Sequence, residues 1–284
     1  MKRILITGMN SYIGNHVEEW LAEFPNNYDV QKISLRNNVW RSIDFSKFDS
    51  ILHVSAIVHT KKIKNNRNLF YKVNRDLTYD IAKKAKDDGV KQFIFLSSMN
   101  VYGLERGVIN HLTPTKPKSH YGISKFQAEN QLKTLINSGI SIAILRPPMI
   151  YGEKSKGNYP KLAKAAQILP VFPNFRNRRS MLHIDNLSEF IRLLIENEEN
   201  GIFFPQNKEY VNTSKMVHII SLIHNRKIKM VNIFNPILNL TIGKIKIITK
   251  IFGSLVYDKN LSAYHTNYQV REFEKSLVIS EKER

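Results

Sequence analysis

The sequence predicts an α/β fold built on a parallel β-sheet, and two observations carry this prediction. Short apolar runs, each long enough for a buried strand, alternate with longer segments whose apolar residues recur at helical spacing. The first apolar run also leads directly into a glycine-containing turn that opens a helix. Alternating strands and helices are typical of parallel sheets, because a helix carries the chain back after each strand.

The expected elements follow in order along the first half of the chain. Strands are expected at residues 4–6, 30–35, 51–54, 93–96 and 142–145. Helices are expected from Tyr12, over 69–86 and over 121–136. The last two helices are followed by Gly89 and Gly139, and glycine is a common helix stop. After residue 148 prolines become frequent and the alternation loosens, which indicates a domain transition near residue 150.

Composition limits the class of protein. The 284 residues are 42% hydrophobic and 24% charged, as expected for a globular chain and not a disordered one. There is no cysteine, which excludes disulfides, thiolate metal sites and a cysteine nucleophile. The apolar run at 4–6 is too short for a signal-peptide core, and the uncharged stretch 230–243 is too short to cross a membrane. A cytoplasmic location is therefore expected.

The net charge of +19 is the unusual quantity. Scattered lysines on solvated faces are the favoured interpretation, and nucleic acid, an anionic membrane or a phosphorylated ligand are the alternatives. Residues 228–252 combine basic and apolar side chains. A helix packed on its own domain is the favoured interpretation of this stretch, and an amphipathic surface for a membrane or a partner is the alternative.

Three motifs carry chemistry. In the first, Thr7 to Gly14, a strand leads through a tight turn into a helix whose free N–H groups suit a pyrophosphate. Gly8 allows the turn, Gly14 allows close packing of helix on strand, and Ser11 stands where a glycine is usual and adds a hydroxyl.

The second motif is Tyr121 and Lys125, which are one helical turn apart. An ammonium stabilises a phenolate, so the tyrosine can exchange a proton with an alcohol or ketone. The third is Ser98, at the carboxyl end of the fourth expected strand, where open parallel sheets bind ligands.

In order and spacing, these motifs resemble the extended short-chain dehydrogenase/reductase superfamily in its NAD-dependent epimerase/dehydratase branch, over residues 2–220. The resemblance implies a Rossmann-type doubly wound parallel sheet with a smaller C-terminal lobe. The dinucleotide-binding domain would comprise 1–150, with the chain returning to it around 180–205. Residues 151–284 would form mainly a substrate-binding lobe.

The resemblance also implies site residues. Tyr121 would be the acid/base, Lys125 would tune it and hold the nicotinamide ribose, and Ser98 would hold the substrate oxygen. The implied cofactor contacts are Gly8, Ser11, Tyr12, Ile13, Gly14, Arg36, Asp44, Phe45, Val54, Ser55, Ala56, Asn74, Tyr121, Lys125 and Pro147. The implied substrate contacts are Ser98, Asn100, Asn158, Tyr159, Arg179 and His183.

Departures from the family pattern narrow the reaction. Dehydratases of this branch carry Asp-Glu where Met99 and Asn100 stand, so dehydration is not expected. Arg36 replaces the usual acidic residue and favours NADP(H), with NAD(H) as the alternative, because an arginine accommodates a 2′-phosphate. Met149 replaces a substrate-contacting asparagine of many epimerases. These changes favour net reduction of a keto group.

At the level of subfamilies, the chain is similar to capsule and surface-polysaccharide enzymes that reduce a UDP-linked 4-keto-6-deoxy-N-acetylhexosamine. The shared stretches are 35–37 with Trp40, Ile57 to His59, Arg146 to Gly152, and Gly157 to Tyr159. A UDP-sugar substrate and a homodimer are the implied partners, and neither nucleic acid nor a metal is expected. The alternatives are a 4-epimerase that keeps NAD bound, a non-catalytic dinucleotide-sensing protein, and a nucleic-acid binder.

Overall fold

The computed structural model describes residues 1–58, 67–136 and 138–282, so His59 lies outside the described residues. The chain forms two compact units. The first unit comprises residues 1–103, 114–147 and 188–205, and the second comprises 104–113, 148–187 and 206–284. The chain therefore leaves the first unit at residues 104–113 and again after residue 147, and it returns through residues 188–205.

The first unit is built on a six-stranded sheet in which every strand pair is parallel, as the sequence predicts. The strand order is β10-β6-β4-β3-β1-β2. The strands are β1 (Lys2–Thr7), β2 (Tyr28–Ile33), β3 (Ser50–His53), β4 (Gln92–Leu96), β6 (Ser141–Leu145) and β10 (Gly201–Phe203). The chain passes from β2 across β1 to β3, and ligands bind outside the carboxyl ends of the strands at such a switch point.

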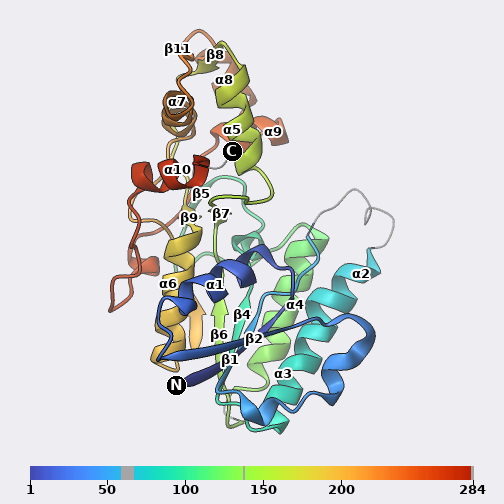
Figure 1. The fold of residues 1–284 in the computed structure, drawn as a ribbon. Helices are drawn as coiled ribbons and strands as arrows, with labels where there is room; N and C mark the ends of the chain where they lie inside the picture. The colour runs from blue at the N-terminus through green and yellow to red at the C-terminus, as the bar shows by residue number, and fades with distance from the viewer. Residues whose placement is uncertain (59–66, 137, 283–284) are drawn as a thin grey trace. The chain divides into compact units, whose positions relative to one another are not determined.

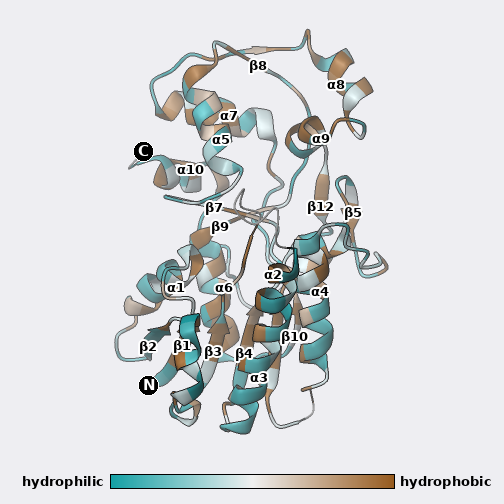
Figure 2. Cartoon of the chain, turned by 90° about the vertical axis from the view of Figure 1, so that its right-hand side faces the viewer, coloured by the Kyte–Doolittle hydropathy of each residue, from teal (hydrophilic) through white to brown (hydrophobic). Residues whose placement is uncertain are grey.

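Helices cover both faces of this sheet, with α1 on one face and α3 and α4 on the other (Figure 1, Figure 2). The helices of this unit are α1 (Tyr12–Ala22), α2 (Asn68–Tyr71), α3 (Leu77–Asp87), α4 (His120–Lys133) and the greater part of α6 (Ile184–Glu196). Successive residues of a strand point to opposite faces of the sheet. Leu5 packs in one hydrophobic core cluster with Ile81 and Leu132, whereas Ile6 lies against Gly14 of α1. Strands buried on both faces explain their continuous apolar runs.

Three elements differ from expectation, and one of them is α4, which ends at Lys133 and not at residue 136. Strand β2 begins and ends two residues before the expected 30–35, because the Ile33 carbonyl accepts the backbone N–H groups of Gly8 and Met9 and the chain then turns. The single helix expected over 69–86 is α2 and α3 separated by a π-helical segment, Lys72–Asp76. A π-turn of this kind often marks a functional site.

The second unit has its own buried core, which includes Tyr151, Tyr159, Val217 and Leu277. Its strands form three parallel pairs, β7–β9, β8–β11 and β5–β12. These strands are β5 (Gly107–Ile109), β7 (Met149–Tyr151), β8 (Val171–Pro173), β9 (Met181–His183), β11 (Lys229–Val231) and β12 (Leu255–Tyr257). Its helices are α5 (Tyr159–Ile168), α7 (Thr213–Ile223), α8 (Asn235–Thr241), α9 (Lys246–Phe252) and α10 (Phe273–Glu281).

The basic and apolar stretch 228–252 folds as β11, α8 and α9 of this unit. Leu238 and Phe252 are buried in the core of the unit, as a helix packed on its own domain requires. Among the described residues, no helix has the length and apolar character to span a membrane.

Candidate active site

The turn after β1 has the geometry of a phosphate-binding cradle. Gly8 adopts φ +110°, and a Cβ there would lie 2.9 Å from the Ser55 hydroxyl. A Cβ on Gly14 would lie 3.1 Å from an Ile6 methyl group and 3.3 Å from a Val54 methyl group, so α1 packs closely against the sheet and a larger residue would be crowded there. The N-terminus of α1 is thereby held at the carboxyl ends of β1 and β3, where its free N–H groups suit a pyrophosphate.

Ser11 fits this turn without strain although a glycine is usual there. Its φ of −72° is ordinary for any residue, and its hydroxyl caps α1 by accepting the N–H of Gly14 at 3.3 Å. Tyr12 and Ile13 follow in the first turn of α1 and are half-buried. The serine hydroxyl therefore stabilises the helix end and leaves its own proton for a ligand oxygen.

The buried side-chain amide of Asn74 holds the loop after β3 by hydrogen bonds to its backbone. Asn74, in the π-helical segment, accepts the N–H of Ile57 at 2.8 Å and donates to the Ile57 carbonyl at 3.0 Å. It also donates to the Ser124 hydroxyl of α4 at 3.2 Å. Val54 is buried, whereas Ser55 and Ala56 are more accessible. Asn74 thus acts on this loop by positioning its backbone.

The residues expected to meet the adenosine lie beyond β2. Arg36 is exposed, and its N–H donates to the Ser34 hydroxyl at 3.3 Å. Asp44 is exposed as well and accepts the N–H of Ser46 at 3.0 Å. Phe45 is different, because its ring is fully buried in the core and only its backbone borders the loop.

The serine that is predicted to hold the substrate oxygen follows the end of β4. Ser98 is half-buried, and its hydroxyl accepts the N–H of Asn100 at 3.2 Å at the start of a short 3₁₀ helix, Met99–Tyr102. Met99 donates to the Pro147 carbonyl at 2.9 Å, which brings Pro147 beside this turn. Asn100 is exposed. The structure therefore brings the predicted Ser98, Asn100 and Pro147 together.

The first turn of α4 brings the predicted tyrosine to this serine. Ser119 caps the helix by accepting the Gly122 N–H at 3.1 Å, and Tyr121 in this first turn lies close to the Ser98 hydroxyl. Burial raises the pKa of Tyr121 to about 12, and the nearby Ser98 hydroxyl lowers it. A phenol beside a hydroxyl is arranged so that both can act on the same substrate oxygen.

Lys125 is one turn further along α4 and is fully buried. Its Nζ donates to the Leu96 carbonyl at 2.7 Å and lies 4.4 Å from the centre of the Phe95 ring. Burial lowers the pKa of Lys125 to about 7, while the Glu129 carboxylate raises it. The ammonium therefore reaches the backbone of the strand that carries Ser98.

Three residues of the site have a role that the sequence did not reveal. Gly122 faces the Asn100 carbonyl, which would lie 2.6 Å from a Cβ, so only glycine lets α4 approach the serine turn. Glu129 and Arg146 form a buried ion pair of 2.6 Å, and Glu129 also accepts the Ser97 hydroxyl. The glycine beside Tyr121 was a usable signal, whereas nothing in the sequence pairs residues 129 and 146.

The predicted substrate-contacting residues of the second unit differ in their exposure to solvent. Asn158 is exposed before α5. Arg179 is half-buried and donates to the Gly253 carbonyl at 2.9 Å. Tyr159 and His183 are fully buried: the Tyr159 hydroxyl donates to Glu281 at 2.6 Å, and the His183 ring packs against Tyr151. The last two side chains hold the core of this unit, and their contact with a substrate stays a prediction.

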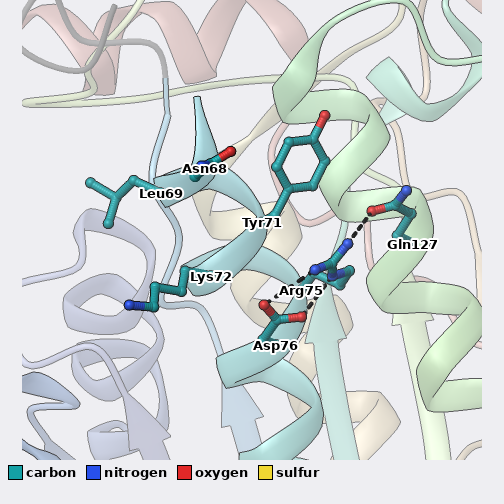
Figure 3. A pocket seen from close by; sticks show the side chains of 7 residues that line it. All are labelled: Asn68, Leu69, Tyr71, Lys72, Arg75, Asp76 and Gln127. Carbon is teal, nitrogen blue, oxygen red and sulfur yellow. Dashed lines mark hydrogen bonds and ion pairs between the residues drawn. The ribbon is translucent and has the colours of Figure 1, made fainter. Parts of the chain in front are cut away.

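A separate hollow of about 700 Å³ lies on the helical side of the first unit (Figure 3). Arg75 crosses it, bonded to Asp76 at 2.6 Å and to Gln127 at 3.0 Å. The remaining lining residues are Asn68, Leu69, Tyr71 and Lys72. None of the predicted cofactor, catalytic or substrate residues lines this hollow. Among the described residues, no three His, Asp or Glu side chains gather as metal ligands.

The family model described as NAD dependent epimerase/dehydratase matches residues 4–204. The chain belongs to this family. It is 30% identical over 250 residues to UDP-glucose 4-epimerase of Vibrio cholerae, covering 78% of this chain and 75% of that protein. It is 28% identical over 253 residues to N-acetyl-alpha-D-glucosaminyl-diphospho-ditrans,octacis-undecaprenol 4-epimerase of Escherichia coli O157:H7, covering 82% and 76%.

Solved structures of extended short-chain dehydrogenases/reductases share the fold of this family member. UDP-glucuronic acid 4-epimerase of Bacillus cereus, in complex with NAD, gives a TM-score of 0.76 at 17% identity over 99% of this chain and 97% of that one. dTDP-4-dehydrorhamnose reductase of Bacillus anthracis, in complex with NADP, gives 0.64 at 19% identity over 82% and 85%. The predicted Rossmann-type fold is thereby confirmed, and the enzyme is a nucleotide-sugar epimerase or reductase of the extended family.

Proposed function

We propose that the protein transfers a hydride at C4 of a diphosphate-linked hexose and that 4-epimerisation of a UDP-hexose or UDP-N-acetylhexosamine is its activity. The proximity of the Ser98 hydroxyl to Tyr121 carries the proposal, because it places a hydroxyl that can polarise a carbonyl beside a phenol that can move a proton. Both relatives named above are 4-epimerases of sugars linked through a diphosphate.

The proposed roles follow from the geometry of the first unit. The Gly8–Gly14 turn would hold the pyrophosphate of a nicotinamide dinucleotide, which when bound accepts a hydride and returns it. As the phenolate, Tyr121 would take the proton of the C4 hydroxyl as the ketone forms, and as the phenol it would give that proton back as the alcohol re-forms. Ser98 donates to the C4 oxygen and keeps it beside Tyr121. Lys125, one helical turn along α4, is proposed to supply the positive charge that favours this phenolate.

In the second unit, Arg179 is proposed to bind the diphosphate. Its guanidinium is largely removed from water, and burial lowers its pKa. No carboxylate pairs with it within the part of the chain that the structure describes. An arginine fork matches phosphate oxygens, so a diphosphate would supply the missing countercharge. Asn158 is exposed and free to contact the sugar.

A 4-keto reductase acting on a UDP-linked 6-deoxy-N-acetylhexosamine is the second candidate, and Arg36 favours it. This arginine is exposed just beyond β2, where an acidic side chain would bind the ribose 2′-hydroxyl of NAD. NADP(H) is therefore the proposed cofactor of that reaction, and NAD(H) is the proposed cofactor of the epimerase. Met99 and Asn100 provide no carboxylate after Ser98, which argues against dehydration in either case.

Two parallel incubations separate the candidates. In the first, UDP-glucose and UDP-N-acetylglucosamine are incubated with the protein and NAD, and the C4 epimer is measured by proton NMR. In the second, the UDP-4-keto-6-deoxy sugar is supplied with NADPH, and absorbance at 340 nm is followed. The epimerase account predicts epimer in the first and no stoichiometric NADPH loss in the second. The reverse pattern would establish the reductase. Absence of both activities would contradict the proposal.

A further inference from the structure

The second unit presents apolar side chains that its own core does not cover. Within α8 and α9, Leu238, Thr249 and Phe252 are buried, whereas the opposite sides of both short helices are exposed. The exposed fractions are 77% for Ile233, 61% for Ile237, 69% for Leu240, 44% for Ile245 and 67% for Ile247. The two helices contact each other, and Figure 2 shows α8 and α9 in the same part of the second unit.

Positive charge accompanies these apolar side chains. Lys244, Lys246 and Lys250 are exposed, and none of them is in an ion pair with any other described residue. The Arg106 guanidinium adds a fourth charge, since it lies 3.0 Å from where a Cβ of Gly243 would be. The sequence has no Asp or Glu from residue 210 to 257. We call Ile233, Ile237, Leu240, Lys244, Ile245, Lys246, Ile247 and Lys250 the basic apolar surface.

We propose that the basic apolar surface docks the protein on an anionic phospholipid bilayer. The apolar side chains would enter the boundary between headgroups and acyl chains, and the lysines would meet the lipid phosphates. Each of the two contributions is weak alone, and peripheral membrane binding typically needs both. This proposal concerns a surface of the second unit and does not depend on the reaction proposed above.

The positive charge of the basic apolar surface favours an anionic bilayer over a second copy of the chain as its binding partner. A two-fold contact through this surface would bring the lysines of both copies, Lys244, Lys246 and Lys250, into one interface without any acidic partner from residues 210–257, and like charges brought together oppose association. An anionic bilayer instead neutralises them. The seven-residue helices α8 and α9 extend only about 10 Å each, far less than a bilayer core, so they can lie on the membrane but not cross it.

Vesicle sedimentation of the full-length protein tests the proposal. The wild-type protein is expected to bind vesicles of phosphatidylglycerol and phosphatidylcholine, and not vesicles of phosphatidylcholine alone. The variant K244Q/K246Q/K250Q is expected to bind about a hundred-fold more weakly, from about 1 kcal/mol per basic residue near an anionic surface. The variant I237Q/L240Q/I247Q is expected to bind at least about tenfold more weakly, because its insertion into the bilayer is lost.

A matched control removes the same charge elsewhere. Lys47, Lys91 and Lys133 are exposed in the first unit, and K47Q/K91Q/K133Q is expected to bind nearly as the wild type does. As a second readout, I237W is expected to show a blue-shifted emission that brominated lipids quench. Equal losses in both lysine variants, undiminished binding by the apolar variant, or no binding by the wild type would each overturn the proposal. So would vesicle-independent self-association that the apolar variant abolishes.

Discussion

At the scale of single residues, the Ser98–Tyr121 pair makes the most direct prediction. Tyr121→Phe removes the proton-transfer group and is expected to lower kcat by about 10²–10⁴-fold. Ser98→Ala removes a donor to the C4 oxygen and is expected to lower kcat by about 10²–10³-fold. Steady-state kinetics at saturating substrate measure both, with Tyr79→Phe on α3 as the matched control. An active Tyr121→Phe variant would refute the assigned role.

His53 gives a prediction about stability and pH. It is fully buried between the Thr7 and Thr78 hydroxyls, at 2.8 Å and 3.0 Å. Burial, together with the charge of Lys125, lowers the pKa of His53 from 6.5 to about 3. Between pH 6.5 and pH 3 the unfolded chain therefore binds a proton that the folded chain does not, so stability falls as the pH falls through this window.

The expected size of this effect is about 2 kcal/mol of unfolding free energy lost between pH 8 and pH 5. Urea denaturation at both pH values measures it. In His53→Asn, whose side chain at this position does not titrate, the loss of unfolding free energy between pH 8 and pH 5 is expected to be smaller by about 2 kcal/mol. An identical pH dependence in the variant and the wild type would show that the pKa of His53 is the same in the folded and unfolded chains, which would contradict this prediction.

At the scale of elements, the approach of α4 to the serine turn depends on Gly122. In Gly122→Ala the new Cβ would clash with the Asn100 carbonyl, so the helix start or the turn must shift. Misplacement of a reacting group by about 1 Å can cost about a hundred-fold in rate. Gly122→Ala is therefore expected to lose at least about tenfold in kcat. Asn130→Ala, on the exposed side of α4, should retain full activity in the same assay.

The buried ion pair further along α4 makes a prediction about folding. Glu129→Gln leaves the Arg146 charge without its partner, and breaking a buried pair typically costs about 3–5 kcal/mol. Chemical denaturation measures the loss, and the double variant E129Q/R146M is expected to recover part of it. A cost below about 1 kcal/mol for E129Q would show that the pair does not stabilise the fold.

The elements of the first unit could be predicted where local pattern decides them. The continuous apolar runs of β1, β3, β4 and β6 place each strand within two residues of its expected position, because both faces of the sheet are covered. The π-helical segment could not be predicted in this way. It contains the buried Asn74, whose partners Ile57 and Ser124 are 17 and 50 residues away along the chain and therefore leave no local pattern.

At the scale of the whole molecule, predictability differs between the two units. The motifs of the first unit are continuous in sequence, and Gly8, Ser98 and Tyr121 have the local geometry that their spacing predicts. The second unit is assembled from three separate segments, and its core joins residues such as Tyr159 and Glu281. Sequence alone did not show that Tyr159 and His183 are buried, because these distant partners determine the burial.

The measurement that tests the central claim most directly follows the hydrogen at C4. UDP-N-acetylglucosamine and UDP-glucose carrying deuterium at C4 are incubated with the protein and NAD, and the epimer is isolated and analysed by NMR and mass spectrometry. Because the hydride leaves and returns at the same carbon, the epimer is expected to keep its deuterium. Epimer that has exchanged the label for solvent hydrogen would contradict a hydride transfer assisted by Ser98 and Tyr121.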